Sequence, residues 1–176
     1  MKSYCRIRPN NTLYNTINKF EIQNNNKTLL VNFTSEVDLN NIQKQIKYKY
    51  NFADIFWINT KNIEIYNIVC KPIINDLFNN QKNGLIFVYG ITNSGKTYTI
   101  NGNPDDPGLV PISLFSIYSE FKILKEKDDL WNLSCTFIEI YNEEVFDLLS
   151  IERKKIKIVG TSNKFEPMGC INKSAT

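Results

Sequence analysis

The segment that most constrains this chain is residues 90–97, GITNSGKT, which follows the apolar run LIFVY at residues 85–89. A glycine, four residues and Gly-Lys-Thr form the phosphate-binding pattern. The glycines let the backbone curl so that successive N–H groups converge on phosphate oxygens, and a helix N-terminus adds its dipole. An apolar run bounded by glycines predicts a strand buried on both faces, and a helix is expected from about Gly95. This context favours a nucleotide site over a glycine-rich turn.

Two side chains of the loop carry the predicted chemistry. Lys96 is expected to reach the β- and γ-phosphates, and the Thr97 hydroxyl to ligate magnesium. An NTPase also needs a residue that holds magnesium from the far side and one that positions the attacking water. Asp147 is the nearest formal match, but it lies inside an apolar run rather than at its end. We therefore assign no catalytic residue.

The order of predicted elements is strand, phosphate loop, helix, helix, strand, which is an α/β pattern. Apolar spacing predicts a helix over residues 63–78, with a kink or restart at Pro72, and a second helix from Pro111 to about Lys125. Strands are predicted at residues 5–8, 20–22 and 28–33, and a long one at 131–141. With no internal repeat and no domain boundary, we expect one domain, a P-loop NTPase-type sheet flanked by helices.

Composition excludes several classes of function. The chain has four cysteines and no histidine, so histidine-dependent serine or cysteine catalysis is excluded and the absence of C-x-x-C argues against zinc. The net charge of +3 is too small for a nucleic-acid footprint. No apolar run is long enough for a membrane span, and the N-terminus lacks the apolar core of a signal peptide. We expect reduced thiols in the cytoplasm, and neither nucleic acid nor membrane as a partner.

Six segments share one order along the chain. They are CRIRP (5–9), YNFADIF (50–56), NGLIFVYG (83–90), GITNSGKTYT (90–99), GLVP (108–111) and IEIYNEEVFDLL (138–149). Each is weak or moderate alone, but all six in this order resemble the kinesin motor domain from residue 5 to residue 149. The resemblance implies the ATP-binding part of a microtubule motor, which in the complete protein couples ATP hydrolysis to movement along microtubules of the cytoskeleton.

The resemblance also implies the residues of an ATP and Mg²⁺ site. In that family the second arginine and the proline of R-x-R-P lie against the adenine, and an aromatic residue or histidine after the loop packs on it. The implied binding residues are Arg8, Pro9, Gly90, Ile91, Thr92, Asn93, Ser94, Gly95, Lys96, Thr97 and Tyr98, with Thr97 also the metal ligand. A strand-edge arginine with no ligand is the alternative for Arg8.

The chain departs from the family pattern at several positions. Ile91 stands where most kinesins have Gln, and Ile112 replaces the usual arginine. The Thr92-Asn93 pair resembles the mitotic kinesin-like group that works at the spindle midzone. The N-x-x-S-S-R (switch I) and D-x-x-G-x-E (switch II) motifs do not occur in the 176 residues, and the family's main microtubule-binding helix lies beyond them. We therefore expect a partial motor domain over residues 1–176, with any homodimer formed through regions that it lacks.

Without those motifs, the chain alone is expected neither to hydrolyse ATP at a motor-like rate nor to walk. An ATPase assay with and without microtubules tests this expectation. The alternative is a truncated non-motor protein that retains only nucleotide or tubulin binding. A GTPase would need the guanine-reading N-K-x-D motif, which is absent.

A basic cluster follows the last motif and contains Arg153, Lys154, Lys155 and Lys157. In the family this region leads into a loop that touches acidic tubulin, so the cluster is a candidate for steering that encounter. The other interpretation is the solvated face of a strand, because Ile156 and Ile158 alternate with two of the lysines. The sequence favours the solvated strand.

Overall fold

The structure is a computed structural model that describes residues 1–9, 20–34, 45–128, 130–161 and 164–175. It divides into two compact units, Met1–Leu114 and Phe115–Thr176. Strands come first along the described chain, helices follow, and further strands come last, with both parallel and antiparallel pairing. The predicted combination of sheet and helices is confirmed. The described strands form four small sheets.

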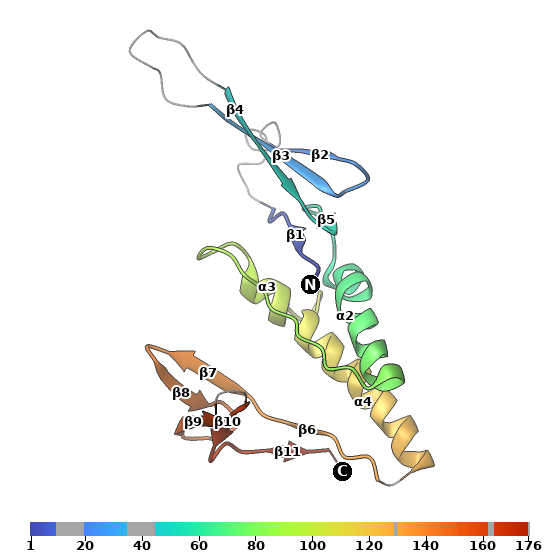
Figure 1. Cartoon of the computed structure of the whole chain (residues 1–176), viewed down its shortest axis with the longest axis vertical. Helices are drawn as coiled ribbons and strands as arrows, with labels where there is room; N and C mark the ends of the chain where they lie inside the picture. The colour runs from blue at the N-terminus through green and yellow to red at the C-terminus, as the bar shows by residue number, and fades with distance from the viewer. Residues whose placement is uncertain (10–19, 35–44, 129, 162–163, 176) are drawn as a thin grey trace. The chain divides into compact units, whose positions relative to one another are not determined.

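The strands of the first unit form an antiparallel sheet and a separate parallel pair (Figure 1). The sheet has the order β2 (Phe20–Gln23), β3 (Thr28–Thr34), β4 (Gln45–Asn51), and the pair joins β1 (Tyr4–Arg6) to β5 (Asp54–Phe56). These elements confirm the three short strands predicted before residue 34.

The core of this unit explains which way β1 faces. Leu29, Val31 and Ile55 are buried together, and Cys5 and Ile7 pack against them. Because side chains alternate along an extended chain, the arginines on either side of Ile7 lie on the opposite face. That face looks away from the core.

Among the described residues, two helices lie within the first unit and a third begins there. The predicted helices correspond to α2 (Asn62–Asn80), α3 (Lys96–Asn101) and α4 (Leu109–Lys127), the last of which runs past the boundary between the units. α2 continues across Pro72 without a restart. Pro111 is the third residue of α4 and not its first, a position that it tolerates because N–H groups of the first turn have no intrahelical acceptor.

The strand predicted at residues 85–89 is wrong for this structure. Among the residues that the structure describes, none pairs with this run in a sheet, and Leu85, Phe87 and Tyr89 are 82%, 65% and 92% exposed. A strand buried on both faces needs pairing neighbours and covering layers, and the described elements supply neither. The run instead connects α2 to α3 as an irregular segment (Figure 1).

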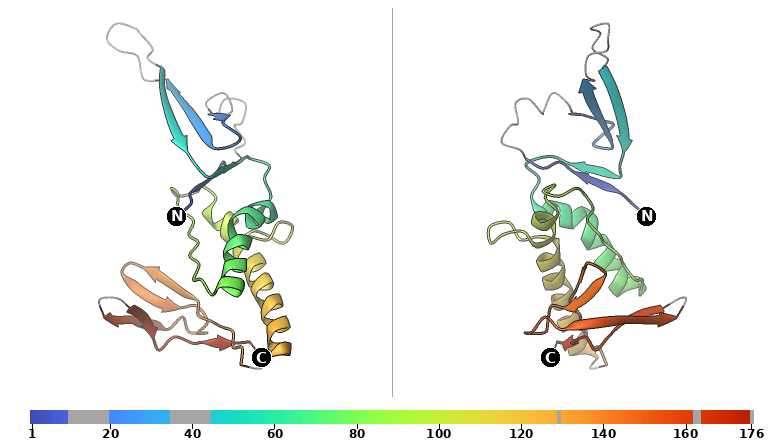
Figure 2. Two further views of the ribbon diagram at one scale, coloured as in Figure 1. Left: turned by 45° about the vertical axis from the view of Figure 1, so that its right-hand side comes forward. Right: turned by 90° about the vertical axis from the view of Figure 1, so that its left-hand side faces the viewer.

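An antiparallel sheet, coloured orange to dark red in Figure 2, dominates the second unit. Its strand order is β10-β9-β8-β7. Its strands are β7 (Ile138–Tyr141), β8 (Glu144–Asp147), β9 (Lys155–Thr161) and β10 (Lys164–Met168), and a separate pair joins β6 (Ser134–Cys135) to β11 (Lys173–Ser174). The long strand predicted at 131–141 is therefore wrong. The chain changes partner within it, because β6 pairs with β11 whereas β7 pairs with β8.

The four cysteines are free thiols, and burial raises the pKa of the Cys5 and Cys70 thiols. Within the described ranges, no group of three or more Cys, Asp or Glu side chains is arranged to hold a metal ion. No helix in the described part of the chain is long and apolar enough to cross a membrane.

Candidate nucleotide-binding site

The phosphate loop, residues 90–97, folds back on itself before α3 begins. The Ser94 N–H donates to the Ile91 carbonyl at 3.2 Å, and Asn93 and Gly95 have φ values of 63° and 99°. A Cβ at Gly90 would lie 2.5 Å from Ser94 Oγ, so a larger residue there would force the Ser94 side chain to move. The Thr99 N–H then donates to the Gly95 carbonyl at 2.9 Å, which confirms the predicted start of a helix here.

Lys96 turns its ammonium group back over the loop. Lys96 Nζ donates to the Gly90 carbonyl at 2.8 Å and to the Ile91 carbonyl at 2.7 Å. The Thr97 side chain, next along the chain, is exposed. A cation at the mouth of a tightly curled, glycine-containing loop beside an exposed hydroxyl suits a magnesium-bound polyphosphate.

Arg8 is brought to the same loop from the N-terminal end of the chain. Its guanidinium donates to the Asn93 carbonyl, and its Cδ would lie 3.7 Å from a Cβ placed at Gly95. Pro9 is exposed next to it. The structure thus unites Arg8 with the loop, while the contact of Arg8 and Pro9 with adenine stays a prediction.

Tyr98 follows the loop and is held at two points. Its hydroxyl donates to Asp106 Oδ2 at 2.6 Å, and the Arg6 guanidinium lies over its ring, 5.1 Å from the centroid. The hydrogen bond to Asp106 raises the pKa of Tyr98 above its ordinary value, so the phenol is neutral. The side chain is nevertheless 41% exposed, which leaves part of the ring available for contact.

Arg6 was not among the predicted site residues. Arg6 Nη1 donates to Asn62 Oδ1 at 2.6 Å and to Thr99 Oγ1 at 2.9 Å, and Nη2 donates to the Thr60 carbonyl at 3.2 Å. Burial lowers the pKa of Arg6 from its ordinary value, and the neighbouring Tyr98 and Asp106 oppose that shift. The sequence contained one signal that could have identified Arg6. Residues two apart in an extended strand lie on the same face, so Arg6 is on the same side as the predicted site residue Arg8.

Asn62 and Asp106 are the other two members of this network, and nothing local in the sequence marks them. Asn62 is fully buried, and its Nδ2 donates to the Tyr98 carbonyl at 3.3 Å and to the Asp106 carbonyl at 3.2 Å. Its backbone N–H donates to Asp106 Oδ1 at 3.1 Å. The network therefore ties β1 and the first turn of α2 to the helix that follows the phosphate loop.

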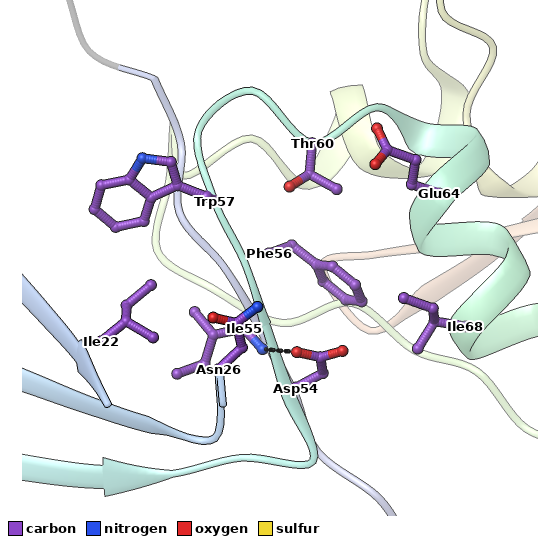
Figure 3. A pocket seen from close by; sticks show the side chains of 9 residues that line it. All are labelled: Ile22, Asn26, Asp54, Ile55, Phe56, Trp57, Thr60, Glu64 and Ile68. Carbon is purple, nitrogen blue, oxygen red and sulfur yellow. Dashed lines mark hydrogen bonds between the residues drawn. The ribbon is translucent and has the colours of Figure 1, made fainter. Parts of the chain in front are cut away.

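A pocket of about 290 Å³ lies elsewhere in the first unit, between β5 and the first turns of α2 (Figure 3). Its lining includes the carboxylates of Asp54 and Glu64, and none of the described residues that line it is Lys or Arg. Two carboxylates disfavour a polyanion through like-charge repulsion. No predicted site residue lines this pocket, and its two carboxylates do not favour a nucleotide there.

Asp147 has a structural environment in the second unit. It is fully buried, and its two carboxylate oxygens accept the Ile171 N–H at 2.8 Å and the Leu149 N–H at 2.9 Å. These backbone bonds, that of Ile171 first, hold the pKa of Asp147 below its ordinary value. Both carboxylate oxygens thus accept backbone hydrogen bonds in a buried position, where they are not accessible to a metal ion.

The basic cluster of residues 153–157 is partly neutralised. Arg153 pairs with Glu139, and Lys155 pairs with Glu144. In β9, Ile156 is buried while Lys155 and Lys157 are exposed. The ion pairs and exposed lysines agree with the solvated strand face that the sequence favours. The predicted alternation holds only at Ile156, because Ile158 is 42% exposed.

Comparison with known proteins adds an independent finding. The family described as Kinesin motor domain matches residues 6–170. Kinesin-related protein 4 of Dictyostelium discoideum is 38% identical over 117 residues, which cover 64% of this chain and 6% of that protein. Kinesin-like protein tea2 of Schizosaccharomyces pombe is 33% identical over 104 residues, 59% of this chain and 16% of that protein. Protein claret segregational of Drosophila melanogaster is 31% identical over 165 residues, 90% of this chain and 22% of that protein. The chain thus spans less than a quarter of the length of these relatives.

Proposed function

Because this chain belongs to the kinesin motor domain family, we propose that it forms the ATP-binding part of a microtubule motor. The observation that carries the proposal is the phosphate loop itself, where the Lys96 ammonium lies over a loop that Gly90 and Gly95 allow to curl. In the complete protein, ATP hydrolysis is coupled to movement on microtubules. The chain's own residues supply the grip on the nucleotide.

In this proposal each group has a distinct task. Lys96 releases the Gly90 and Ile91 carbonyls and donates to phosphate oxygens, which gain more from an ionised donor than neutral carbonyls do. The Thr97 hydroxyl would hold Mg²⁺, which would supply positive charge to neutralise the phosphates. Arg8, which bonds to the loop, and the adjacent Pro9 contact the base, which also packs on Tyr98.

The proposed partner is tubulin, and the proposed location is the microtubule cytoskeleton of the cytoplasm. The family match and the kinesin relatives support both. The Thr92-Asn93 pair supports a finer placement in the mitotic midzone group. Imaging of the tagged full-length protein through mitosis tests this placement, and absence from the midzone would contradict it.

Calorimetric titration of the chain with ATP and Mg²⁺ tests the nucleotide site. Lys96→Ala is expected to weaken binding by about 10- to 100-fold, because it removes hydrogen bonds from a charged donor. Lys71→Ala, at an exposed lysine of α2, is the matched control and should bind as the wild type does. A folded wild-type chain that binds ATP no better than Lys96→Ala would refute the proposal.

The motor activity is tested on the complete protein. Its steady-state ATPase rate should rise on addition of microtubules, and the same Lys96→Ala substitution should abolish the rise. An ATPase rate that does not change when microtubules are added would contradict the motor assignment. It would not contradict the proposed nucleotide site.

A further inference from the structure

We infer that Asp106 is a positioning residue that, together with Arg6, fixes the Tyr98 ring as a stacking surface for the purine base of the nucleotide. The inference rests on the proposed ATP site and adds the group that holds its base-binding surface. It starts from the bond between the Tyr98 hydroxyl and Asp106 Oδ2, 2.6 Å long, and from the guanidinium 5.1 Å above the ring. A tyrosine ring has two rotatable bonds, and these two contacts together restrain both.

The position of Asp106 is held by hydrogen bonds to groups other than Tyr98. Its carboxylate accepts the Asn62 N–H at 3.1 Å, at the start of α2. Its own N–H donates to Asn103 Oδ1 at 2.7 Å, and its carbonyl accepts the Asn103 N–H at 3.1 Å. The Asn62 side chain donates to that carbonyl as well, at 3.2 Å. Four hydrogen bonds thus hold Asp106 independently of Tyr98.

Arg6 is also anchored, and its guanidinium lies over the ring. Its guanidinium is bonded to Asn62, Thr99 and the Thr60 carbonyl, so it stays over the ring. The positive charge of Arg6 and the negative charge of Asp106 therefore border the same aromatic side chain. Since Tyr98 remains 41% exposed, the contacts fix the ring without covering it.

The physical gain is preorganisation. An exposed tyrosine that must be ordered when a base stacks on it loses rotamer freedom, whereas a tethered one has already lost it. Loss of the tether should therefore weaken binding of the whole nucleotide by about 2- to 10-fold. The phosphate grip is separate, because the Lys96 ammonium bonds to the Gly90 and Ile91 carbonyls and not to this network.

The test compares two ligands, ATP with Mg²⁺ and inorganic tripolyphosphate with Mg²⁺, by calorimetric titration of the whole chain. Tyr98→Phe keeps the ring and removes only the hydroxyl that donates to Asp106. Asp106→Asn is the second variant, and the double variant closes a mutant cycle. Tyr141→Phe, at a tyrosine 61% exposed in β7, is the matched control. Thermal melting of each variant shows that it is folded.

The inference expects Tyr98→Phe to lose about 2- to 10-fold in ATP affinity, with tripolyphosphate affinity unchanged and no further loss in the double variant. Wild-type affinity for ATP in Tyr98→Phe would overturn it. Equal losses for both ligands would also overturn it, because the bond would then support the loop as a whole and not the base surface. A wild-type chain that binds neither ligand would refute the proposed function, and the inference with it.

Discussion

Replacing Asn62, the first residue of α2, by alanine should destabilise the first unit. Asn62 is fully buried and makes three side-chain hydrogen bonds, one from the Arg6 guanidinium and two to the carbonyls of Tyr98 and Asp106. A bond from a charged donor contributes about 1.5–3 kcal/mol, and a bond between neutral groups about 0.5–1.5 kcal/mol. Alanine removes all three and leaves a small void.

The partners left behind decide where in that range the loss falls. Arg6 keeps its bonds to Thr99 and the Thr60 carbonyl. The Tyr98 carbonyl keeps the Gly102 N–H at 2.9 Å, and the Asp106 carbonyl keeps the Asn103 N–H at 3.1 Å. Since none of these groups is stranded, we expect a loss of about 2–3 kcal/mol in the free energy of unfolding, toward the low end of the simple sum.

Urea denaturation measures this loss in the first unit alone. Trp57 belongs to the first unit and Trp131 to the second, so Trp57 fluorescence in a Trp131→Phe background isolates the relevant transition. The midpoint should fall while the slope is unchanged. Asn67→Ala is the matched control because Asn67 is exposed on the same helix, and it should stay within about 0.5 kcal/mol of the parent. An Asn62→Ala variant as stable as Asn67→Ala would refute the reasoning.

Three more substitutions test other parts of the chain. Asn32 Oδ1 is buried with no hydrogen-bond partner among the described residues. Asn32→Val in β3 should therefore raise the free energy of unfolding of the first unit by about 1 kcal/mol, seen as a higher urea midpoint, and a lower midpoint would contradict this. A Cβ at Gly108 would overlap the Ile100 carbonyl oxygen, so Gly108→Ala should cost about 1–3 kcal/mol in the same assay, and wild-type stability would show that the backbone yields freely. The pKa of Asp147 is lowered on folding, first by the Ile171 N–H, so its carboxylate stabilises the second unit above about pH 4 and this stabilisation is lost as the pH falls through the folded pKa. Asp147→Asn should therefore reduce the difference in melting temperature between pH 7 and pH 3, and an unchanged difference would count against this role.

Local patterns in the sequence were sufficient for the helices and for the phosphate loop. Helical spacing of apolar residues predicted α2 and α4, and the glycine pattern predicted where α3 begins, because these features depend on contacts a few residues apart. The strand over 85–89 was predicted from the same kind of evidence and is wrong, because a buried strand depends on neighbours that the run itself does not specify. The strand over 131–141 was wrong for a related reason, since pairing partners divide it into β6 and β7.

For the site, the sequence by itself was enough to predict the phosphate loop with Lys96 and Thr97. The whole pattern lies within the eight residues 90–97, so it depends only on local conformation. Only the tertiary structure decided that Arg6 and Asp106 contact the Tyr98 side chain and that Asn62 bonds to both of them. Asn62 and Asp106 are 44 positions apart in the sequence, and Arg6 and Asn62 are 56 positions apart. Hydrogen bonds over such separations require the chain to bring β1, α2 and the end of α3 together, and no short-range rule specifies that.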